Sequence, residues 1–393
     1  MEPSDNTVAF CALNSIFGYH PRLALNLIER AGGPLQVFAG PPPELPDHPE
    51  LAEQVRPEAL ERAREELRKV YGKGFLFLCP EDDDYPEPLR ECGDPPLGLY
   101  LRGASSPTEV FGLRPLVAFV GTRDMSLYGK AWCQKLVQAL SEASVQPAIV
   151  SGLALGVDGV AHRTALECGL PTVGVMATGI ETIYPWQHRQ LADVIAGFPG
   201  CALVTDYPPG TAPVALNFMR RNRIIAGLAR ATVVVETKTK GGSLMTAKYA
   251  VEYNRDVFAV PGRLDDVRSA GCNSLIASDM AGIVSSPEQL VDALGLGGGR
   301  RHRGEGGSWI TSQAGDPPEK VLQAQLARKY GPGSPLVNIG LTVLQQRGIT
   351  PEELAAMVRR PYGEVLSGIG TLEADGFLTT DLLQRCSIDG KFA

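Results

Sequence analysis

The sequence predicts an α/β protein built on a doubly wound, mostly parallel β-sheet, with a small helical domain before the sheet and a winged-helix-like domain after it. Three observations support this prediction. Short runs rich in valine, isoleucine and alanine alternate with helical stretches between residues 75 and 294. Buried parallel strands have this composition because helices cover both faces of their sheet. Helical spacing fills the first 70 residues, and a helix–turn–helix–strand pattern follows residue 336.

Length and composition limit the classes of protein to which the chain can belong. Its 393 residues predict two or three domains, because single domains usually contain about 100 to 200 residues. Eight scattered cysteines and five histidines show no metal-finger spacing, so we expect reduced thiols and no metal. No signal peptide and no apolar run of about 18 residues is present, which predicts a cytoplasmic protein without membrane contact.

Residues 1–72 are predicted to form a small helical domain of the SAM-like or helix-hairpin-helix-like type. Apolar residues recur at helical spacing from Val8 to Ile28, and a charged helix is expected at 57–70 after a proline-rich stretch. The short helix, glycine turn and short helix over 13–33 are typical of modules that contact DNA backbones. Helices that only pack together have the same pattern.

Residues 73–295 are predicted to form the sheet and its covering helices. The expected strands are the apolar runs at 116–120, 148–150, 172–176, 202–205, 232–235 and 257–260. The expected crossover helices are 128–141, 158–168, 188–195, 222–229 and 243–253. Ligands of such sheets bind at the carboxyl ends of the strands, where glycine, serine and threonine are concentrated in this chain.

The last quarter of the chain contains a linker and a second domain. Residues 296–320 are rich in glycine and arginine, which predicts a flexible, locally basic linker. Residues 321–393 are predicted to be winged-helix-like, with Thr350 capping a helix and Glu353 completing the capping box. The presumed helices carry five acidic residues, Glu352, Glu353, Glu364, Glu373 and Asp375. A protein-interaction or vestigial role is therefore at least as favoured as duplex DNA binding.

Positive charge is concentrated in residues 217–248. This segment has seven basic side chains and one carboxylate, whereas the whole chain carries a net charge of −7. Phe218 lies among the arginines. Guanidinium groups bind phosphate oxygens and aromatic rings stack on bases, so the combination predicts single-stranded nucleic acid as a partner. The alternative is a surface helix whose arginines are only solvated.

Three small-residue turns are predicted to open helices at the carboxyl edge of the sheet. They are Gly121-Thr122-Arg123, Ser151 to Gly156, and Gly241 to Leu244. Backbone N–H groups at such helix N-termini bind anions, so three turns beside the arginines predict a track for several phosphates. The alternative for any single turn is close packing.

The sequence shows no catalytic machinery. Asp158 and His162 are four residues apart on a predicted helix, but a capping carboxylate and a packed imidazole explain that spacing better than acid–base catalysis. No nucleophile elbow, Walker loop, paired carboxylates or dinucleotide fingerprint occurs at these turns. An enzyme therefore stays possible on these residues, although no catalytic group is recognisable, and no cofactor is expected.

Six segments in order resemble the motifs of the DNA processing protein A family, DprA/Smf. They are FVGTRDMSLYGK (119–130), SGLALGVDGVAHRTALECG (151–169), DYPPGTAP (206–213), FMRRNRIIAGLA (218–229), GGSLMTAKYAVEYNRDVFAVPG (241–262) and GCNSLI (271–276). The resemblance implies an extended Rossmann-like domain and a cytoplasmic, non-enzymatic homodimer. It also implies that the protein binds and protects single-stranded DNA and loads the RecA recombinase onto it during natural transformation.

The resemblance also implies site residues. The family's DNA pocket corresponds to Gly121, Thr122, Arg123, Ser151, Gly152, Phe218, Arg220, Arg221, Asn222, Arg223, Gly242, Ser243 and Leu244. Leu275 and Ile276 are the candidates for the dimer or recombinase-facing surface. The chain departs from the family at Leu155, where a basic residue is usual, and at Met219, where a proline is usual.

Two other functions stay open. Nucleotide N-glycosidases that activate cytokinins have a Gly-Gly turn resembling G-G-x-G-T-x-x-E, but this chain has Lys248 where their catalytic glutamate stands. A transcription regulator would use the winged-helix-like domain to bind duplex DNA, which the acidic helices disfavour.

Overall fold

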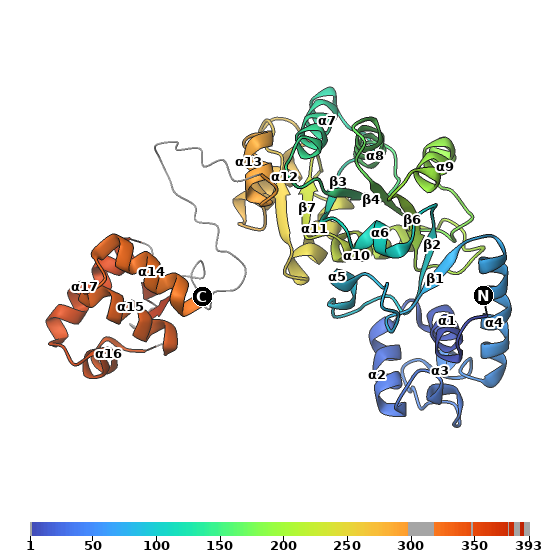
Figure 1. Cartoon of the computed structure of the whole chain (residues 1–393), viewed down its shortest axis with the longest axis horizontal. Helices are drawn as coiled ribbons and strands as arrows, with labels where there is room; N and C mark the ends of the chain where they lie inside the picture. The colour runs from blue at the N-terminus through green and yellow to red at the C-terminus, as the bar shows by residue number, and fades with distance from the viewer. Residues whose placement is uncertain (1, 298–317, 347–348, 376, 381–385, 389–393) are drawn as a thin grey trace. The chain divides into compact units, whose positions relative to one another are not determined.

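The computed structural model describes residues 2–297, 318–346, 349–375, 377–380 and 386–388. The chain divides into two compact units, residues 1–301 and residues 302–393. The first unit contains a sheet with helices on both faces (Figure 1). Within the described residues this sheet has nine strands, in the order β1-β2-β6-β5-β4-β3-β7-β8-β9.

The predicted mostly parallel sheet is confirmed. The six expected strands are β3 (Leu116–Val120), β4 (Ala148–Ser151), β5 (Thr172–Val175), β6 (Ala202–Thr205), β7 (Ala231–Val234) and β8 (Asp256–Ala259). Neighbouring members of this set pair in parallel. Three further strands were not predicted: antiparallel β1 (Leu76–Leu78) and β2 (Leu99–Arg102), and parallel β9 (Gly282–Ile283). Strands β1 and β9, with three and two residues, are too short for a periodic signal.

Strand β3 lies at the point where the strand order reverses. The chain proceeds from β3 through β4 and β5 to β6 on one side, and then returns to place β7 on the other side of β3. Ala118 therefore pairs with Val150 of β4 and with Thr232 of β7. The loops that leave β3 and β7 separate there, which makes this edge the expected ligand site of a doubly wound sheet.

Helices cover both faces because β3 is apolar on both. Its five residues are all buried, and successive side chains point to opposite faces. Val117 and Phe119 share a core with α7 (Leu127–Ser141) and α8 (Val157–Glu167). Ala118 and Val120 share a core with α10 (Ala215–Leu228) and α11 (Ser243–Glu252) on the opposite face (Figure 1).

Helix α10 begins seven residues before the predicted start at residue 222. Pro213 favours an extended conformation at the preceding residue, and Val214 is itself extended. The helix therefore begins directly after this proline-rich turn, and the whole arginine cluster becomes helical. Arg221 consequently points to a different side of the helix from Arg220 and Arg223, which are three residues apart and share a face.

Residues 1–72 are helical, as expected. They form α1 (Asp5–Phe17), α2 (Pro21–Ala31), η1 (Gln36–Phe38), α3 (Pro49–Ala52) and α4 (Pro57–Gly72). These helices share a core with β1, β2 and α9 (Arg189–Gly197), so they belong to the same compact unit as the sheet. Assignment to a SAM-like domain stays a prediction.

Short elements complete the first unit. They are α5 (Glu87–Arg90), α6 (Pro107–Phe111), η2 (Trp186–His188), α12 (Ala270–Ala277) and α13 (Pro287–Ala293). Most of the predicted linker, residues 298–317, lies outside the described residues. No helix in the described part of the chain is both long and apolar enough to cross a membrane.

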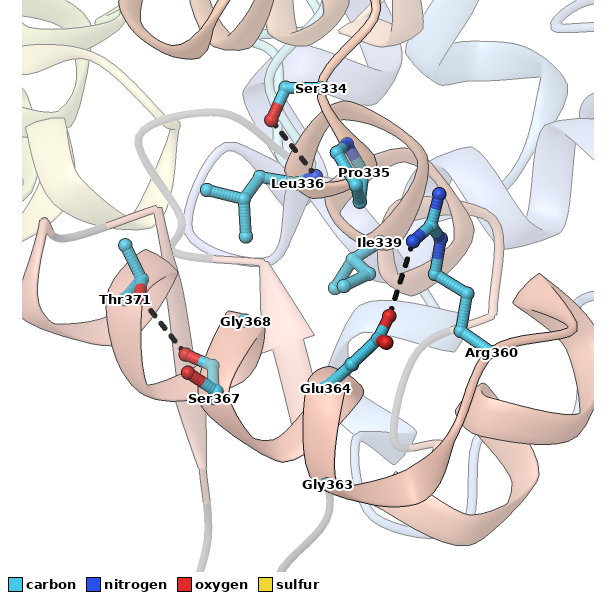
Figure 2. Close-up of a pocket in the computed structure, with 10 residues that line it drawn as sticks. All are labelled: Ser334, Pro335, Leu336, Ile339, Arg360, Gly363, Glu364, Ser367, Gly368 and Thr371. Atoms are coloured by element: carbon cyan, nitrogen blue, oxygen red, sulfur yellow. Dashed lines mark hydrogen bonds and ion pairs between the residues drawn. The ribbon is translucent and has the colours of Figure 1, made fainter.

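The second unit consists of helices and a small antiparallel sheet. Its elements are α14 (Pro318–Tyr330), α15 (Pro335–Gln345), α16 (Pro351–Val358), α17 (Tyr362–Ala374), β10 (Leu378–Thr380) and β11 (Cys386–Ile388). The predicted capping box is present, because Thr350 and Glu353 each accept a hydrogen bond from the other's backbone N–H. A pocket of about 510 Å³ between α15 and α17 has the Arg360–Glu364 ion pair in its lining (Figure 2).

Candidate nucleic-acid interface

A groove of about 780 Å³ lies at the carboxyl ends of β3 and β7. The loops after these strands, the beginning of α10 and the beginning of α11 form its walls. The predicted site residues in its lining are Gly121, Thr122, Arg123, Phe218, Arg221, Asn222, Gly242 and Ser243. Residues from three distant parts of the sequence therefore meet at the switch point of the sheet.

Basic side chains predominate in the groove. Arg123, Lys238 and Lys240 are exposed, and none of them forms an ion pair within the described residues. The two carboxylates in the lining are Asp124 and Asp158, and Asp158 is buried among hydrogen bonds. The exposed charge that a ligand meets is therefore mainly positive, which favours an anionic partner.

Two aromatic rings and one guanidinium form a cluster in the groove. The Arg123 guanidinium carbon lies 5.2 Å from the centroid of the Phe218 ring. The Tyr184 ring lies 5.3 Å from Phe218 at an interplanar angle of 57°. Both separations are in the range of attractive cation–π and aromatic contacts. The cluster places aromatic surface beside a positive charge that has no ion-pair partner among the described residues.

Arg221 lines the groove, but its guanidinium is hydrogen-bonded to backbone carbonyls of the sheet. Its Nη1 donates to the backbone carbonyls of Gly152 and Val175, at the ends of β4 and β5. A side chain at position 152 would collide with this guanidinium, because a Cβ there would lie 2.5 Å from Nη2. Burial lowers the pKa of Arg221 to about 10, although Asp158 opposes that shift. Arg221 therefore ties two strand ends together beneath the groove.

Arg223 does not line the groove. Its Nη2 is 2.7 Å from Oδ2 of Asp206, and its Nη1 donates to the Asp94 carbonyl at 2.6 Å. Burial disfavours the charged guanidinium, but Asp206 and Asp94 outweigh that effect and raise its pKa. A buried guanidinium paired in this way is not available to a phosphate.

Arg220 also points away from the groove. Its guanidinium lies 4.1 Å from the centroid of the Tyr19 ring and donates to the Gly18 carbonyl. Tyr19 in turn donates to the side chain of Asn217 on α10. Arg220 thus joins α10 to the N-terminal helices. Of the four arginines predicted to contact DNA, Arg123 and Arg221 line the groove, whereas Arg220 and Arg223 do not.

In the turn after β3, a carboxylate of the chain itself, that of Glu236, takes the position predicted for a phosphate. Glu236 accepts hydrogen bonds from the Ser126 hydroxyl and, at 2.9 Å, from the Ser126 N–H at the start of α7. The Thr122 N–H donates to the Glu236 carbonyl at 2.7 Å. Gly121 is required for close packing, because a Cβ would lie 2.4 Å from Val157. The predicted phosphate site at α7 is therefore occupied by Glu236.

The turn after β4 is filled in the same way. Oδ2 of Asp158 accepts from the backbone N–H groups of Gly152 and Ala154 at 3.1 and 3.3 Å. Ser151 is fully buried and donates to the Phe119 carbonyl. His162 is buried against Thr172, and burial lowers its pKa to about 3. Capping and packing therefore account for Asp158 and His162.

The turn before α11 is open. Within the described residues the backbone N–H groups of Gly242 and Ser243 have no acceptor, and no side chain caps this helix. The Ser243 hydroxyl donates to Thr237, and Asn222 donates to the Gly242 carbonyl, so the turn is well ordered. Leu244 packs against the core and does not line the groove. The N-terminus of α11 is the anion site that remains available.

The other predicted residues are placed as follows. Leu275 is buried in the core on α12, and Ile276 packs half-buried against it. Leu155 is exposed but does not line the groove, whereas Met219 is exposed and does. The departure from the family at Met219 therefore changes the groove wall, while the one at Leu155 lies outside it.

Sequence reasoning missed Tyr184, Lys238 and Lys240 as groove residues. The two lysines lie in the basic segment and follow β7, so their position after a strand could have identified them. Tyr184 lies in the loop after β5, 34 residues before Phe218, and no local pattern relates the two. Within the described residues, no cluster of three potential metal-ligating side chains occurs.

Comparison with known proteins relates this groove to one family. The sequence model for DNA recombination-mediator protein A matches residues 76–295, which include every groove residue. Protein Smf of Synechocystis sp. is 44% identical over 229 residues, which cover 58% of this chain and 56% of that relative's length. DNA processing protein DprA of Streptococcus pneumoniae is 39% identical over 226 residues, 58% of this chain and 77% of that protein.

Solved structures show the same similarity. The structure of DNA processing protein A from Streptococcus pneumoniae superposes with a TM-score of 0.59 at 30% identity, covering 74% of this chain and 98% of that one. The structure from Helicobacter pylori, which concerns that protein's single-stranded DNA binding mode, has a TM-score of 0.50 at 28% identity. It covers 56% of this chain and 95% of that one.

Proposed function

Because the chain belongs to the DNA recombination-mediator protein A family, we propose that it is a DNA-processing protein whose groove binds single-stranded DNA. The observation that carries the proposal is the cluster of Arg123, Phe218 and Tyr184 in a groove that also exposes two lysines. Cations that follow a backbone and rings that accept bases are the features of single-strand binding sites. The Helicobacter pylori relative, whose structure concerns single-stranded DNA binding, supports the choice of ligand.

The strand would contact two kinds of group in the groove. Its phosphates bind Arg123, Lys238 and Lys240 and the open N-terminus of α11, while a base stacks on Phe218. Each neutralised phosphate on a single strand contributes about −0.7 to the slope of log affinity against log salt. Each stacked base contributes about 1 to 3 kcal/mol.

This arrangement favours single strands over duplex DNA. In a duplex the bases are already stacked on one another, so the Phe218 ring has no free base to accept. Duplex binding then retains only the phosphate contacts. The protein should accordingly bind oligothymidylate more tightly than a duplex of the same length.

A conservative substitution tests the stacking contact. Phe218→Leu keeps an apolar side chain but removes the ring, so affinity for oligothymidylate should fall by about 5- to 100-fold. Phe198→Leu is the matched control, because Phe198 packs against the core just before β6, at the opposite end of the strands. Fluorescence anisotropy measures both. Equal affinities of the two variants for oligothymidylate would overturn the proposed binding mode.

We propose further that the protein acts in natural transformation, where it protects incoming DNA and loads RecA onto it as a cytoplasmic homodimer without enzymatic activity. Family membership supports this role. Two grooves in a dimer could engage one strand and raise avidity. Sedimentation measures whether the protein is a dimer. The rate of ATP hydrolysis by RecA on single strands to which this protein is bound measures RecA loading. A monomeric protein would contradict the proposed homodimer. A rate of RecA ATP hydrolysis that the protein does not change would contradict the proposed RecA loading.

The groove gives no support to the nucleotide N-glycosidase alternative. Lys248, which replaces the catalytic glutamate of those enzymes, is exposed on α11 and does not line the groove. Chromatographic detection of ribose release from nucleoside monophosphates would restore that alternative.

For the second unit we propose a winged-helix fold that contacts a protein. Three successive helices, α15 to α17, precede a two-stranded antiparallel sheet, which is the element order of that fold. Glu364 and Glu373 are exposed on α17, the helix that would enter a DNA groove. Carboxylates there repel phosphates. Duplex binding by residues 320–393 would contradict this proposal.

A further inference from the structure

Trp186 is an exposed aromatic residue just beyond the groove. Its side chain is 77% exposed, and it does not line the groove itself. It begins the η2 turn and follows Tyr184 by two residues, so the two Cα atoms are at most about 7 Å apart. Tyr184 lines the groove and is itself 44% exposed. Trp186 therefore lies close in the chain to the aromatic residue Tyr184 of the groove.

The turn that carries Trp186 is firmly held. His188, at the end of the same turn, is buried, and its Nδ1 lies 2.8 Å from the Leu153 carbonyl in the loop after β4. The next residue of that loop, Ala154, lines the groove. Because His188 is anchored beside the groove wall, Trp186 stands on a rigid support at the carboxyl edge of the sheet.

Two uncompensated cations flank this turn. Arg163 of α8 lies 3.3 Å from His188, measured from Nη2 to Nε2, and Arg189 begins α9 directly after the turn. Both are exposed, and neither forms an ion pair within the described residues. The nearby carboxylates of Glu181 and Asp193 are each paired with a basic residue of another element. The surface around Trp186 therefore attracts anions.

We infer that Trp186, Arg163 and Arg189 form a second contact region for the DNA strand that leaves the groove past Tyr184. A base stacks on the Trp186 indole, and the arginines bind the adjoining phosphates. Aromatic and cationic groups in succession are what a single strand requires, since each nucleotide offers a flat base and a charge. This inference rests on the proposed function, because it needs a strand in the groove.

Tryptophan fluorescence tests the inference directly. The chain has three tryptophans, so Trp132→Phe combined with Trp309→Phe leaves Trp186 as the single reporter. Adding oligothymidylate should quench its emission because the indole stacks on thymine. A second experiment introduces Trp186→Ala alone, with the other tryptophans kept. Affinity for a long oligothymidylate should fall by about 5- to 100-fold. Affinity for a short oligothymidylate, which is long enough only to fill the groove, should fall by less than 2-fold. Anisotropy of the labelled oligonucleotide measures binding independently of the indole.

A second variant tests the cations. Arg189→Ala should reduce the magnitude of the salt slope by about 0.7 on the long oligonucleotide. Arg230→Ala should leave the slope unchanged, because Arg230 is exposed at the amino end of β7, where its N–H donates to the carbonyl of Leu116.

The outcomes separate this inference from the proposed function. Binding that is unquenched and unaffected by Trp186→Ala would overturn the second contact region and leave the groove intact. If the unsubstituted protein showed no anisotropy change with either oligonucleotide, the groove proposal and the second region would fall together.

Discussion

Arg123 and Arg223 carry the same charge but have opposite surroundings. Arg223 is buried between Asp206 and the Asp94 carbonyl, whereas Arg123 is exposed, unpaired within the described residues and stacked on Phe218. An arginine that is buried beside a carboxylate stabilises the fold. An arginine that is exposed beside an aromatic ring is available to a ligand. The location of the counter-charge therefore decides which arginine is available to an anionic ligand.

The helix N-termini show the same contrast. Glu236 occupies the start of α7, and Asp158 occupies the turn after β4, so both positions already hold an anion. The start of α11 holds none within the described residues. Similar small-residue turns thus serve packing in two places and leave a binding position in the third.

The largest expected effect is on stability, from loss of Arg223. Arg223→Ala should lower the free energy of unfolding by about 3 to 5 kcal/mol, because Asp206 stays buried without its partner. Arg123→Ala should change it by less than about 0.5 kcal/mol, since that side chain is exposed. Urea unfolding measures both variants. If the urea midpoints of Arg223→Ala and Arg123→Ala were similar, the distinction between the buried and the exposed arginine would be wrong.

The next effect concerns a buried group beside the groove. Burial lowers the pKa of His162 from 6.5 to about 3, so its neutral form stabilises the fold above pH 6.5 and this contribution is lost as the pH falls toward 3. Between pH 7 and pH 5 the loss should be about 2 kcal/mol.

The control for this prediction is His162→Asn, which keeps a donor for Thr172 but takes up no proton. Its free energy of unfolding should fall less between pH 7 and pH 5. Parallel pH profiles of the variant and the unsubstituted protein would show that His162 is not the titrating group.

A smaller effect is expected at the filled helix N-terminus. Glu236→Ala removes the carboxylate that bonds Ser126 and should cost about 1 to 2 kcal/mol of stability. Affinity for oligothymidylate should stay within 2-fold, because Glu236 serves α7 and does not line the groove. Thermal unfolding and anisotropy measure the two quantities. A large loss of affinity without a loss of stability would place Glu236 in the binding site.

The sequence predicted the fold and the position of the groove better than the role of each residue. Strand β3 was predicted at its observed bounds because a run buried on both faces is continuously apolar. Arg123 and Phe218, two of the predicted DNA-binding residues, line the groove, and each lies next to a turn or cluster that is recognisable in the sequence. The partner of Arg223 was not predictable, since Asp206 is 17 residues away and no local pattern relates the two.

Helix geometry explains the remaining differences. Residues 220, 221 and 223 are close in sequence, but a helix directs 221 to a different side from 220 and 223, and the sequence alone does not show which side faces the groove. Tyr184 was missed because it reaches the groove from another loop. Tertiary packing, which brings distant segments together, supplies this information.

Salt-dependent binding of oligothymidylate tests the central claim most directly. Substituting alanine for Arg123, Lys238 and Lys240 together should reduce the magnitude of the salt slope by about 2, which is about 0.7 for each phosphate that the protein no longer neutralises. Arg230→Ala should leave the slope unchanged, because Arg230 lies at the opposite end of the strands. A slope that the triple substitution does not alter, in a protein that still binds the strand, would contradict the assignment of the groove as the phosphate-binding site.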